Sequence, residues 1–205
     1  MRVMIVSLAI MVAGWCPLAA CGAAPGAPQQ MLCEGLVNPS GIDRVQPRFS
    51  WAIPPGARGL TQTAYQLLVA DSPAALAAER ELLWDSGKVA SNQSQWVSYA
   101  GAPLAKGMSC WWKVRVWDQA DTASPWSEPA SLSVGPLSAA DWQGDWIGVD
   151  WMTNNEGPLP WLRKTVTLQQ APTTAVIYVC ALGYYELHVN GRKVGDDVLS
   201  PAVSD

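Results

Sequence analysis

Few side chains in this chain of 205 residues have the types and spacing that acid–base chemistry requires. Asp196 and Asp197 are adjacent carboxylates. Neighbouring side chains on an extended strand point to opposite faces, so these two would not act as a pair. We interpret them as a solvated turn after the hairpin. His188 is the only histidine. With no nameable partner, it is interpreted as a structural or exposed residue rather than a general base. The sequence therefore predicts no catalytic residue.

The sequence also lacks the motifs that usually bind a metal ion or a cofactor. The sequence contains no Cys-x-x-Cys pair and no Cys/His cluster, which argues against a zinc site. It also contains no G-x-S-x-G, H-E-x-x-H or phosphate-binding loop motif. We therefore expect no cofactor and no metal ligand.

Tryptophan is the unusual component, with twelve residues against a single phenylalanine. Its side chain can fill a core or offer a flat platform for a sugar ring. Trp151 and Trp161 flank a loop rich in Pro, Gly and Asn, and they are our candidates for contact with a glycan. For Trp111 and Trp117 two interpretations remain, stacking on sugar or covering an interface with a neighbouring module. The second is favoured because exposed apolar patches usually mark contacts.

The N-terminus has the features of an export signal. Arg2 precedes an uncharged, mainly apolar run that is short for a membrane span, which indicates a signal peptide over residues 1–20. The sequence Leu-Ala-Ala-Cys ending at Cys21 resembles a bacterial lipobox, in which this cysteine becomes the lipidated N-terminus. The alternative is an ordinary signal cut after a small residue such as Ala24. Residues 21–30 are expected to form a flexible tether.

These features predict an exported protein, either an outer-membrane lipoprotein or a periplasmic or extracellular one. Its membrane contact would then come only from the lipid anchor. The formal charge of −4 and the lack of a basic run argue against nucleic-acid binding. Three cysteines remain beyond the signal, Cys33, Cys110 and Cys180. An odd number leaves at least one without a partner in this sequence, and the sequence does not determine the pairing.

Residues 31–136 consist of short alternating runs separated by turn residues, which predicts an antiparallel β-sandwich. The clearest run is CWWKVRVWD, in which Trp112, Val114 and Val116 share a face expected to be in the core. One helix is predicted over residues 72–83, capped by Ser72. Other strands are expected within residues 47–53, 63–70, 82–89, 94–99 and 125–135.

Residues 141–205 also read as strands, but they make up only part of a sandwich or jelly roll. Strands are expected at WLRKTVTL and TTAVIYVC, followed by a hairpin whose turn is Asn190-Gly191. So small a sheet has few ways to cover its apolar face or its edges. We therefore expect these residues to fold poorly by themselves.

The first module resembles a fibronectin type III domain. Trp51 stands where such domains keep a core tryptophan on the second strand, and LAKGMSCWWKVRV matches their Leu, Gly and alternating strand. The corner tyrosine of the family would fall at Cys110, so the sequence departs from the pattern at that corner. The resemblance implies an all-β chain with a fibronectin-like sandwich followed by an incomplete second module.

A more specific resemblance covers residues 32–201. Ordered segments are similar to the N-terminal region of bacterial α-L-rhamnosidases, glycoside hydrolases of the family 78 type, among them NPSGIDRVQPRFSWAI, CWWKVRVWDQ, DWQGDWIG and ALGYYELHVNGRKVGDDVLSP. The end departs slightly, because Ala202 and Val203 stand where the family has a Gly and an aromatic residue. In that family the catalytic acids lie in a later helical barrel.

The resemblance implies the non-catalytic N-terminal part of an inverting enzyme that removes terminal α-L-rhamnose from glycosides. Its expected partners are rhamnose-containing glycosides, bound by the full-length enzyme, and the catalytic domain that this sequence lacks. The alternative is a non-catalytic surface lipoprotein whose β-modules bind glycan or protein.

Overall fold

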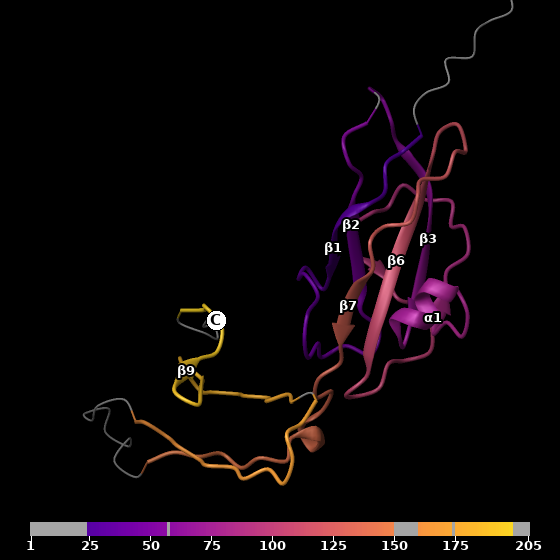
Figure 1. Ribbon diagram of the computed structural model, residues 1–205. Coiled ribbons are helices and arrows are strands. Elements are labelled where there is room, and N and C mark those ends of the chain that lie inside the picture. The colour runs from indigo at the N-terminus through magenta and orange to yellow at the C-terminus, as the bar shows by residue number, and fades with distance from the viewer. Residues whose placement is uncertain (1–23, 57, 150–159, 174, 199–205) are drawn as a thin grey trace, which may run out of the picture.

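The computed structural model describes residues 24–56, 58–149, 160–173 and 175–198. Two parts are visible in Figure 1: a β-sandwich formed by the described residues up to 138, and a second segment, residues 142–149, 160–173 and 175–198, extending away from its base. The one-turn 3-10 helix η1 (Ala139–Asp141) joins them. Asp141 accepts hydrogen bonds from the backbone N–H groups of Leu137 and Ser138, both at 2.9 Å, which fixes the direction of the connection.

The sandwich consists of two antiparallel sheets. One has the strand order β1-β2-β5, and its strands are Gln29–Cys33, Arg48–Ala52 and Val97–Ser98. The other has the order β4-β3-β6-β7, with strands Trp84–Asp85, Gln62–Ala70, Ser109–Asp118 and Ala130–Ser133. This arrangement confirms the predicted all-β, fibronectin type III-like sandwich. Strand β1 begins inside the stretch that we expected to be a tether, since Gln29 pairs with Ala52.

Strands β3 and β6 supply the centre of the core. Their register pairs Leu67 with Val114 and Val69 with Trp112. All four of these side chains are fully buried, which confirms the predicted inward face of β6. Burial of each such side chain contributes roughly 1.5–3 kcal/mol. Trp51 is also buried, as expected from the fibronectin-like pattern.

The buried polar groups of Trp51 and Gln62 form hydrogen bonds. The Trp51 indole N–H donates to Gln62 Oε1 at 3.1 Å, and the Gln62 side-chain amide donates to the carbonyls of Ser91 and Gln93. The Gln62 side chain is itself buried. A buried polar group without such partners would cost stability, so these bonds tie the loop before β5 to the core.

The three cysteines of the described chain are free thiols. Cys33 and Cys110 are buried in the same core cluster but on different sheets. No Cα of β1 lies within 8 Å of a Cα of β6, which is too far for a disulfide without backbone movement. Burial raises the pKa of Cys33 to about 12 and that of Cys110 to about 11, so both remain neutral. Cys180, in contrast, is exposed.

Helix α1 (Pro73–Ala78) is shorter than the predicted span of residues 72–83. The Ser72 hydroxyl caps its start, as predicted, by accepting from the Ala75 N–H at 3.2 Å. The helix ends at Glu79, whose φ of 53° is left-handed. The Lys113 ammonium holds the Glu79 carboxylate at 2.8 Å, and the following Leu83 packs against the core instead of continuing the helix.

In its described residues the second segment contains an isolated β-bridge at Tyr185 and one pair of strands, the hairpin of β8 (His188–Val189) and β9 (Arg192–Lys193). Its turn is the predicted Asn190-Gly191, and both residues have the positive φ that this turn requires. The strand predicted at residues 161–168 is absent, because these residues have no strand partner and all lie exposed. The described residues of the next predicted strand, 173 and 175–180, form no strand either.

Candidate functional site

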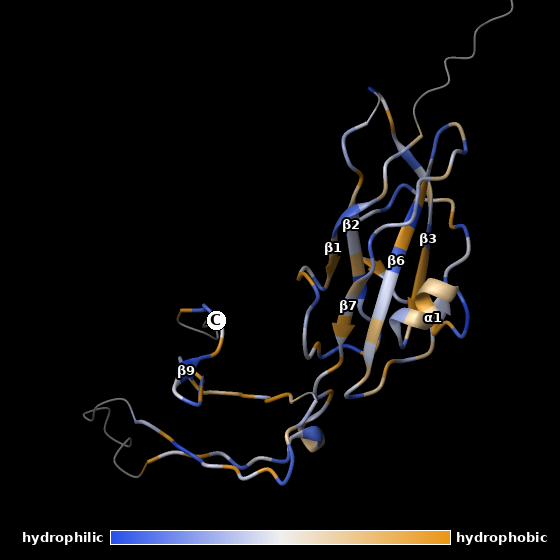
Figure 2. Ribbon diagram, in the orientation of Figure 1, coloured by the Kyte–Doolittle hydropathy of each residue, from blue (hydrophilic) through white to orange (hydrophobic). Residues whose placement is uncertain are grey.

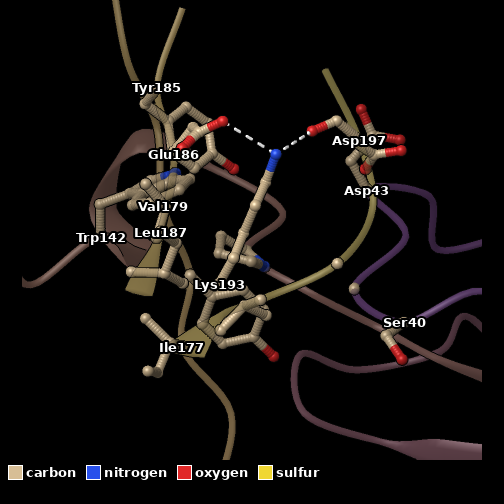
Figure 3. Close-up of a pocket in the computed structure, with 15 residues that line it drawn as sticks. Ser40, Asp43, Trp142, Ile177, Val179, Tyr185, Glu186, Leu187, Lys193 and Asp197 are labelled. Atoms are coloured by element: carbon tan, nitrogen blue, oxygen red, sulfur yellow. Dashed lines mark hydrogen bonds and ion pairs between the residues drawn. The ribbon is translucent and has the colours of Figure 1, made fainter. Parts of the chain in front are cut away.

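A crevice of about 490 Å³ lies where the second segment meets the base of the sandwich. Figure 3 shows side chains from both parts of the chain around it. The sandwich contributes Ser40, Gly41, Asp43 and Pro136. The second segment contributes residues 177–179, 185–187 and 193–195, together with Trp142 and Asp197.

Two glycines allow the chain to approach itself closely at this point. Gly41 has a φ of +77°, and a Cβ added there would lie 3.3 Å from Cε1 of Tyr178. A Cβ added to Gly135 would lie 2.7 Å from the Gly41 carbonyl oxygen. Backbone hydrogen bonds hold the two loops together, because Ile42 donates to the Ser133 carbonyl and Gly135 donates to the Ile42 carbonyl, both at 2.8 Å. Side chains at either glycine would separate these surfaces.

The charged groups of the crevice are organised around Lys193. Its ammonium donates to Glu186 Oε1 at 2.9 Å and to the Asp197 backbone carbonyl at 2.8 Å, as Figure 3 shows. His188 Nε2 lies 3.4 Å from the other Glu186 oxygen. The hydrogen bond from Lys193, and after it the one from His188, lowers the pKa of Glu186. Glu186 is therefore an ionised carboxylate at neutral pH.

This geometry can bind, but it is poorly suited to acid catalysis. A general acid in glycoside hydrolysis needs a raised pKa so that it holds a proton near neutral pH. Glu186 is shifted in the opposite direction. No group of three or more His, Cys, Asp and Glu side chains gathers as metal ligands would anywhere in the described residues. What the crevice offers is aromatic surface from Trp142, Tyr178 and Tyr185 beside one ion pair.

The candidate residues from the sequence are not brought together by the structure. Cys21 and Trp151 lie outside the described residues. Trp161 is 98% exposed. Asp197 lines the crevice, whereas the neighbouring Asp196 does not. The sequence analysis missed this crevice because its lining comes from positions as far apart as Ser40 and Asp197.

Trp117 is covered by Arg115 of its own strand and by Lys88 of the loop after β4. The guanidinium of Arg115 lies 5.0 Å from the Trp117 ring centroid and 4.5 Å from that of Trp126. The ammonium of Lys88 lies 4.9 Å from Trp117, and that of Lys113 lies 4.7 Å from Trp126. Each such contact is worth roughly 0.5–2 kcal/mol, depending on solvation.

Trp111 is half-buried against the cluster of Leu68, Ala70 and Leu76 beneath α1. Trp117 is therefore covered within the sandwich, and the interpretation that it lines an interface with another module is wrong, whereas for the partly exposed Trp111 it stays a prediction. Strand periodicity showed which face they occupy, but not that α1 and Trp126 lie on that face.

Within residues 24–198, wherever the structure describes them, no helix is both long and apolar enough to cross a bilayer.

Comparison with known families gives two matches in sequence order. Residues 28–138 match the family described as "Rha78A-like, N-terminal immunoglobulin domain". Residues 170–205 match the "Alpha-L-rhamnosidase N-terminal domain". The first match alone covers more than half of the chain, and its range contains all seven strands of the sandwich.

Individual relatives give the same result. An α-L-rhamnosidase of Formosa agariphila is 37% identical over 180 residues, which are 83% of this chain and 19% of the relative. The crystal structure of a Streptomyces avermitilis α-L-rhamnosidase complexed with L-rhamnose is 39% identical, with a TM-score of 0.56 over 60% of this chain and 12% of that one. The α-L-rhamnosidase from "Dictyoglumus thermophilum" is 33% identical with the same TM-score, over 60% of this chain and 14% of that one.

The chain thus spans about a fifth of the length of the curated relatives it matches. Both family matches describe N-terminal domains, and the described fold contains the expected sandwich. The chain therefore belongs to the family of Rha78A-like N-terminal immunoglobulin domains, and it corresponds to the N-terminal region of α-L-rhamnosidases.

Proposed function

We propose that this chain serves as the non-catalytic N-terminal part of an α-L-rhamnosidase that removes terminal α-L-rhamnose from glycosides. The observation that carries the proposal is the pair of N-terminal family matches in the correct order, over about a fifth of the relatives' length. The remaining length is where the catalytic domain, the principal partner of this chain, would lie.

The chemistry of the described residues supports a non-catalytic role for this region. An inverting glycosidase needs a general acid and a general base about 6.5–9.5 Å apart, with a water molecule between them. The Glu186 carboxylate of the crevice is ionised by its pairing with Lys193, so it is unsuited to be the acid. The acid–base pair is therefore expected in the catalytic domain, and the crevice is a place where surfaces pack.

Export is part of the proposal. Residues 1–20 would direct secretion, and Cys21 would carry the lipid that anchors the enzyme to the outer membrane. Mass spectrometry of the mature N-terminus tests this directly. Lipidated Cys21 supports the anchor, whereas an unmodified N-terminus at Pro25 would support simple secretion after cleavage at Ala24.

The two candidate glycan contacts also remain proposals. The exposed indole of Trp161 leaves its ring accessible to a sugar, which supports this role. Titration of the Trp161→Ala variant with rhamnose-containing oligosaccharides tests the role, and binding equal to that of the wild type would rule it out. Trp151→Ala is the companion variant.

The main experiment is an immunoblot of the native protein in its host, using an antibody against the sandwich, combined with an assay of the purified species on an aryl α-L-rhamnoside. We expect a species much heavier than 22.0 kDa that releases rhamnose. An inactive species of about 22.0 kDa or slightly less would contradict the proposal and would favour a surface lipoprotein that binds without catalysis.

A further inference from the structure

The large exposed apolar side chains of the sandwich lie on the loop between β1 and β2 and beside it. Among its described residues, 24–56 and 58–138, these side chains are Leu36, Val37, Val45 and Trp96, with exposed fractions of 60%, 70%, 41% and 47%. We call these four residues the loop patch. Clustered apolar exposure of this kind marks an interaction surface, whereas isolated exposed residues do not.

Three of the four residues share one loop, and the ring of the fourth reaches that loop. Leu36, Val37 and Val45 belong to the loop between β1 and β2, and Trp96 directly precedes β5, the neighbour of β2 in the sheet. The Trp96 ring reaches this loop, because its Cη2 lies 3.5 Å from where a Cβ on Gly35 would stand. Loop and indole therefore form one surface.

Trp96 is held in place before any partner arrives. Its φ of +56° is unusual for a bulky residue, and its N–H donates to Ser50 Oγ at 2.9 Å. The Arg48 guanidinium lies 4.5 Å from its ring centroid, and Glu34 binds that guanidinium at 2.7 Å. Trp and Arg are among the residue types that are enriched in the energetically dominant contacts of protein interfaces. Backbone strain of this kind is concentrated at functional surfaces.

The chemistry favours a protein occupant over a glycan. Three aliphatic side chains accompany Trp96, and they offer no hydrogen-bonding group to sugar hydroxyls. The same loop also supplies Ser40, Gly41 and Asp43 to the crevice, where it already meets the second segment. The patch thus extends a contact that exists between two parts of this chain.

We propose that the loop patch docks the catalytic domain of the same polypeptide, which the relatives' length places beyond the region described here. This inference rests on the proposed function and identifies the surface through which the N-terminal region meets its partner. Domains joined in this way typically bury about 600–1,500 Å² against each other.

Hydrogen–deuterium exchange on the chain of 205 residues and on the full-length enzyme tests the inference. We expect peptides that cover residues 34–46 and 95–97 to exchange at least about tenfold more slowly in the full-length enzyme. Val37→Asp should abolish that difference and lower the unfolding midpoint of the full-length enzyme only, because Val37 is exposed in the shorter chain. Ala102→Asp, at an exposed position outside the patch, is the matched control and should change neither protein.

Three results would overturn the inference. The first is equal exchange of the patch in both proteins. The second is dimerisation of the shorter chain that Val37→Asp abolishes, which would make a second copy the occupant. The third is loss of oligosaccharide binding in Trp96→Ala without any change in full-length stability. An enzyme that hydrolyses rhamnosides but leaves the patch unprotected would refute only this inference, whereas an inactive native protein of 22.0 kDa would refute the proposed function.

Discussion

The sandwich and the second segment contain similar apolar patterns, but the sandwich buries these side chains and the second segment leaves them exposed. Figure 2 shows hydrophobic residues along both parts of the chain. In the sandwich, Trp112 and Val114 are completely buried, whereas in the second segment Trp161 is 98% exposed and Val166 is 69% exposed. An alternating apolar run therefore predicts a strand only where another strand and a second layer are available to cover it.

Strand pairing shows where this difference begins. Strands β3 and β6 pair continuously from Ala64–Trp117 to Ala70–Trp111, and the second sheet covers their inner face. The hairpin of the second segment has only two residue pairs. A two-stranded hairpin is at best marginally stable in water without a layer to pack on. Covering the second segment would thus require further polypeptide.

The largest expected difference between the two parts is in amide exchange. Amides of β3 and β6 should exchange only through global unfolding, whereas those of residues 161–168 should exchange almost freely, at least about a thousandfold faster. Hydrogen–deuterium exchange on the purified chain measures this. Strong protection of residues 161–168 would show that the second segment has a core of its own.

Thiol reactivity should separate the two parts almost as clearly. At pH 8 the pKa of about 12 leaves roughly one Cys33 side chain in ten thousand as thiolate, and burial also blocks access. Cys180 is exposed, so alkylation of residues 24–205 should modify Cys180 alone in the native state. Mass mapping after brief iodoacetamide treatment measures this. The denatured protein, with three modified thiols, is the control, and rapid native labelling of Cys110 would contradict the prediction.

Tryptophan truncation should show the same contrast in stability. Trp112→Ala removes a completely buried side chain and should cost about 3–5 kcal/mol in the free energy of unfolding, measured by urea denaturation. Trp161→Ala should have almost no effect. Trp112→Phe is an informative control, because Trp112 Nε1 makes no hydrogen bond within the described residues. Trp112→Phe should therefore cost less stability than Trp112→Ala. Equal costs for Trp112→Ala and Trp161→Ala would contradict the comparison.

The smallest expected effect is on stability and comes from the ion pair between Glu34 and Arg48, which lies beside the loop patch. Burial alone would raise the pKa of Glu34, but hydrogen bonds from the Arg48 side chain and backbone, with the charges of Arg48 and Arg44, lower it below its ordinary value of 4.5. The ionised form thus stabilises the fold above about pH 4.5, and this contribution is lost as the pH falls through the lower folded-state pKa.

Glu34→Gln should therefore reduce the unfolding free energy by about 1 kcal/mol at pH 7 and by less at pH 3. Urea midpoints at both pH values measure the effect. Asp121→Asn, which breaks the exposed pair with Lys88, is the matched control and should show little change. An equal loss at both pH values would mean that Glu34 acts through packing rather than charge.

Much of the fold could be predicted from local pattern. The alternation in β6, the Ser72 cap and the Asn190-Gly191 turn each depend on interactions within a few residues, and all three are confirmed. The predicted helix was too long. It ends at the left-handed Glu79, and Leu83 packs against the core instead of continuing the helix. The predicted strand at residues 161–168 was wrong, because these residues form no strand pairing and all lie exposed.

The crevice and the loop patch could not be read from the sequence. Their residues are separated by tens of positions along the chain and meet only because the loop between β1 and β2 folds against Gly135 and beside Trp96. Likewise, periodicity placed Arg115 and Trp117 together on the outer face of their sheet but did not reveal Lys88, which also covers Trp117.

The sequence by itself determined the family, the all-β sandwich and the lack of a recognisable catalytic motif in this region, since these depend on residue order and short-range pattern. Tertiary structure alone decided which apolar side chains are buried, which tryptophans stay accessible and where two parts of the chain meet. The physical reason is that burial is a property of pairs of distant surfaces. A residue carries its apolar character in the sequence, but only the folded neighbours determine whether water is removed from it.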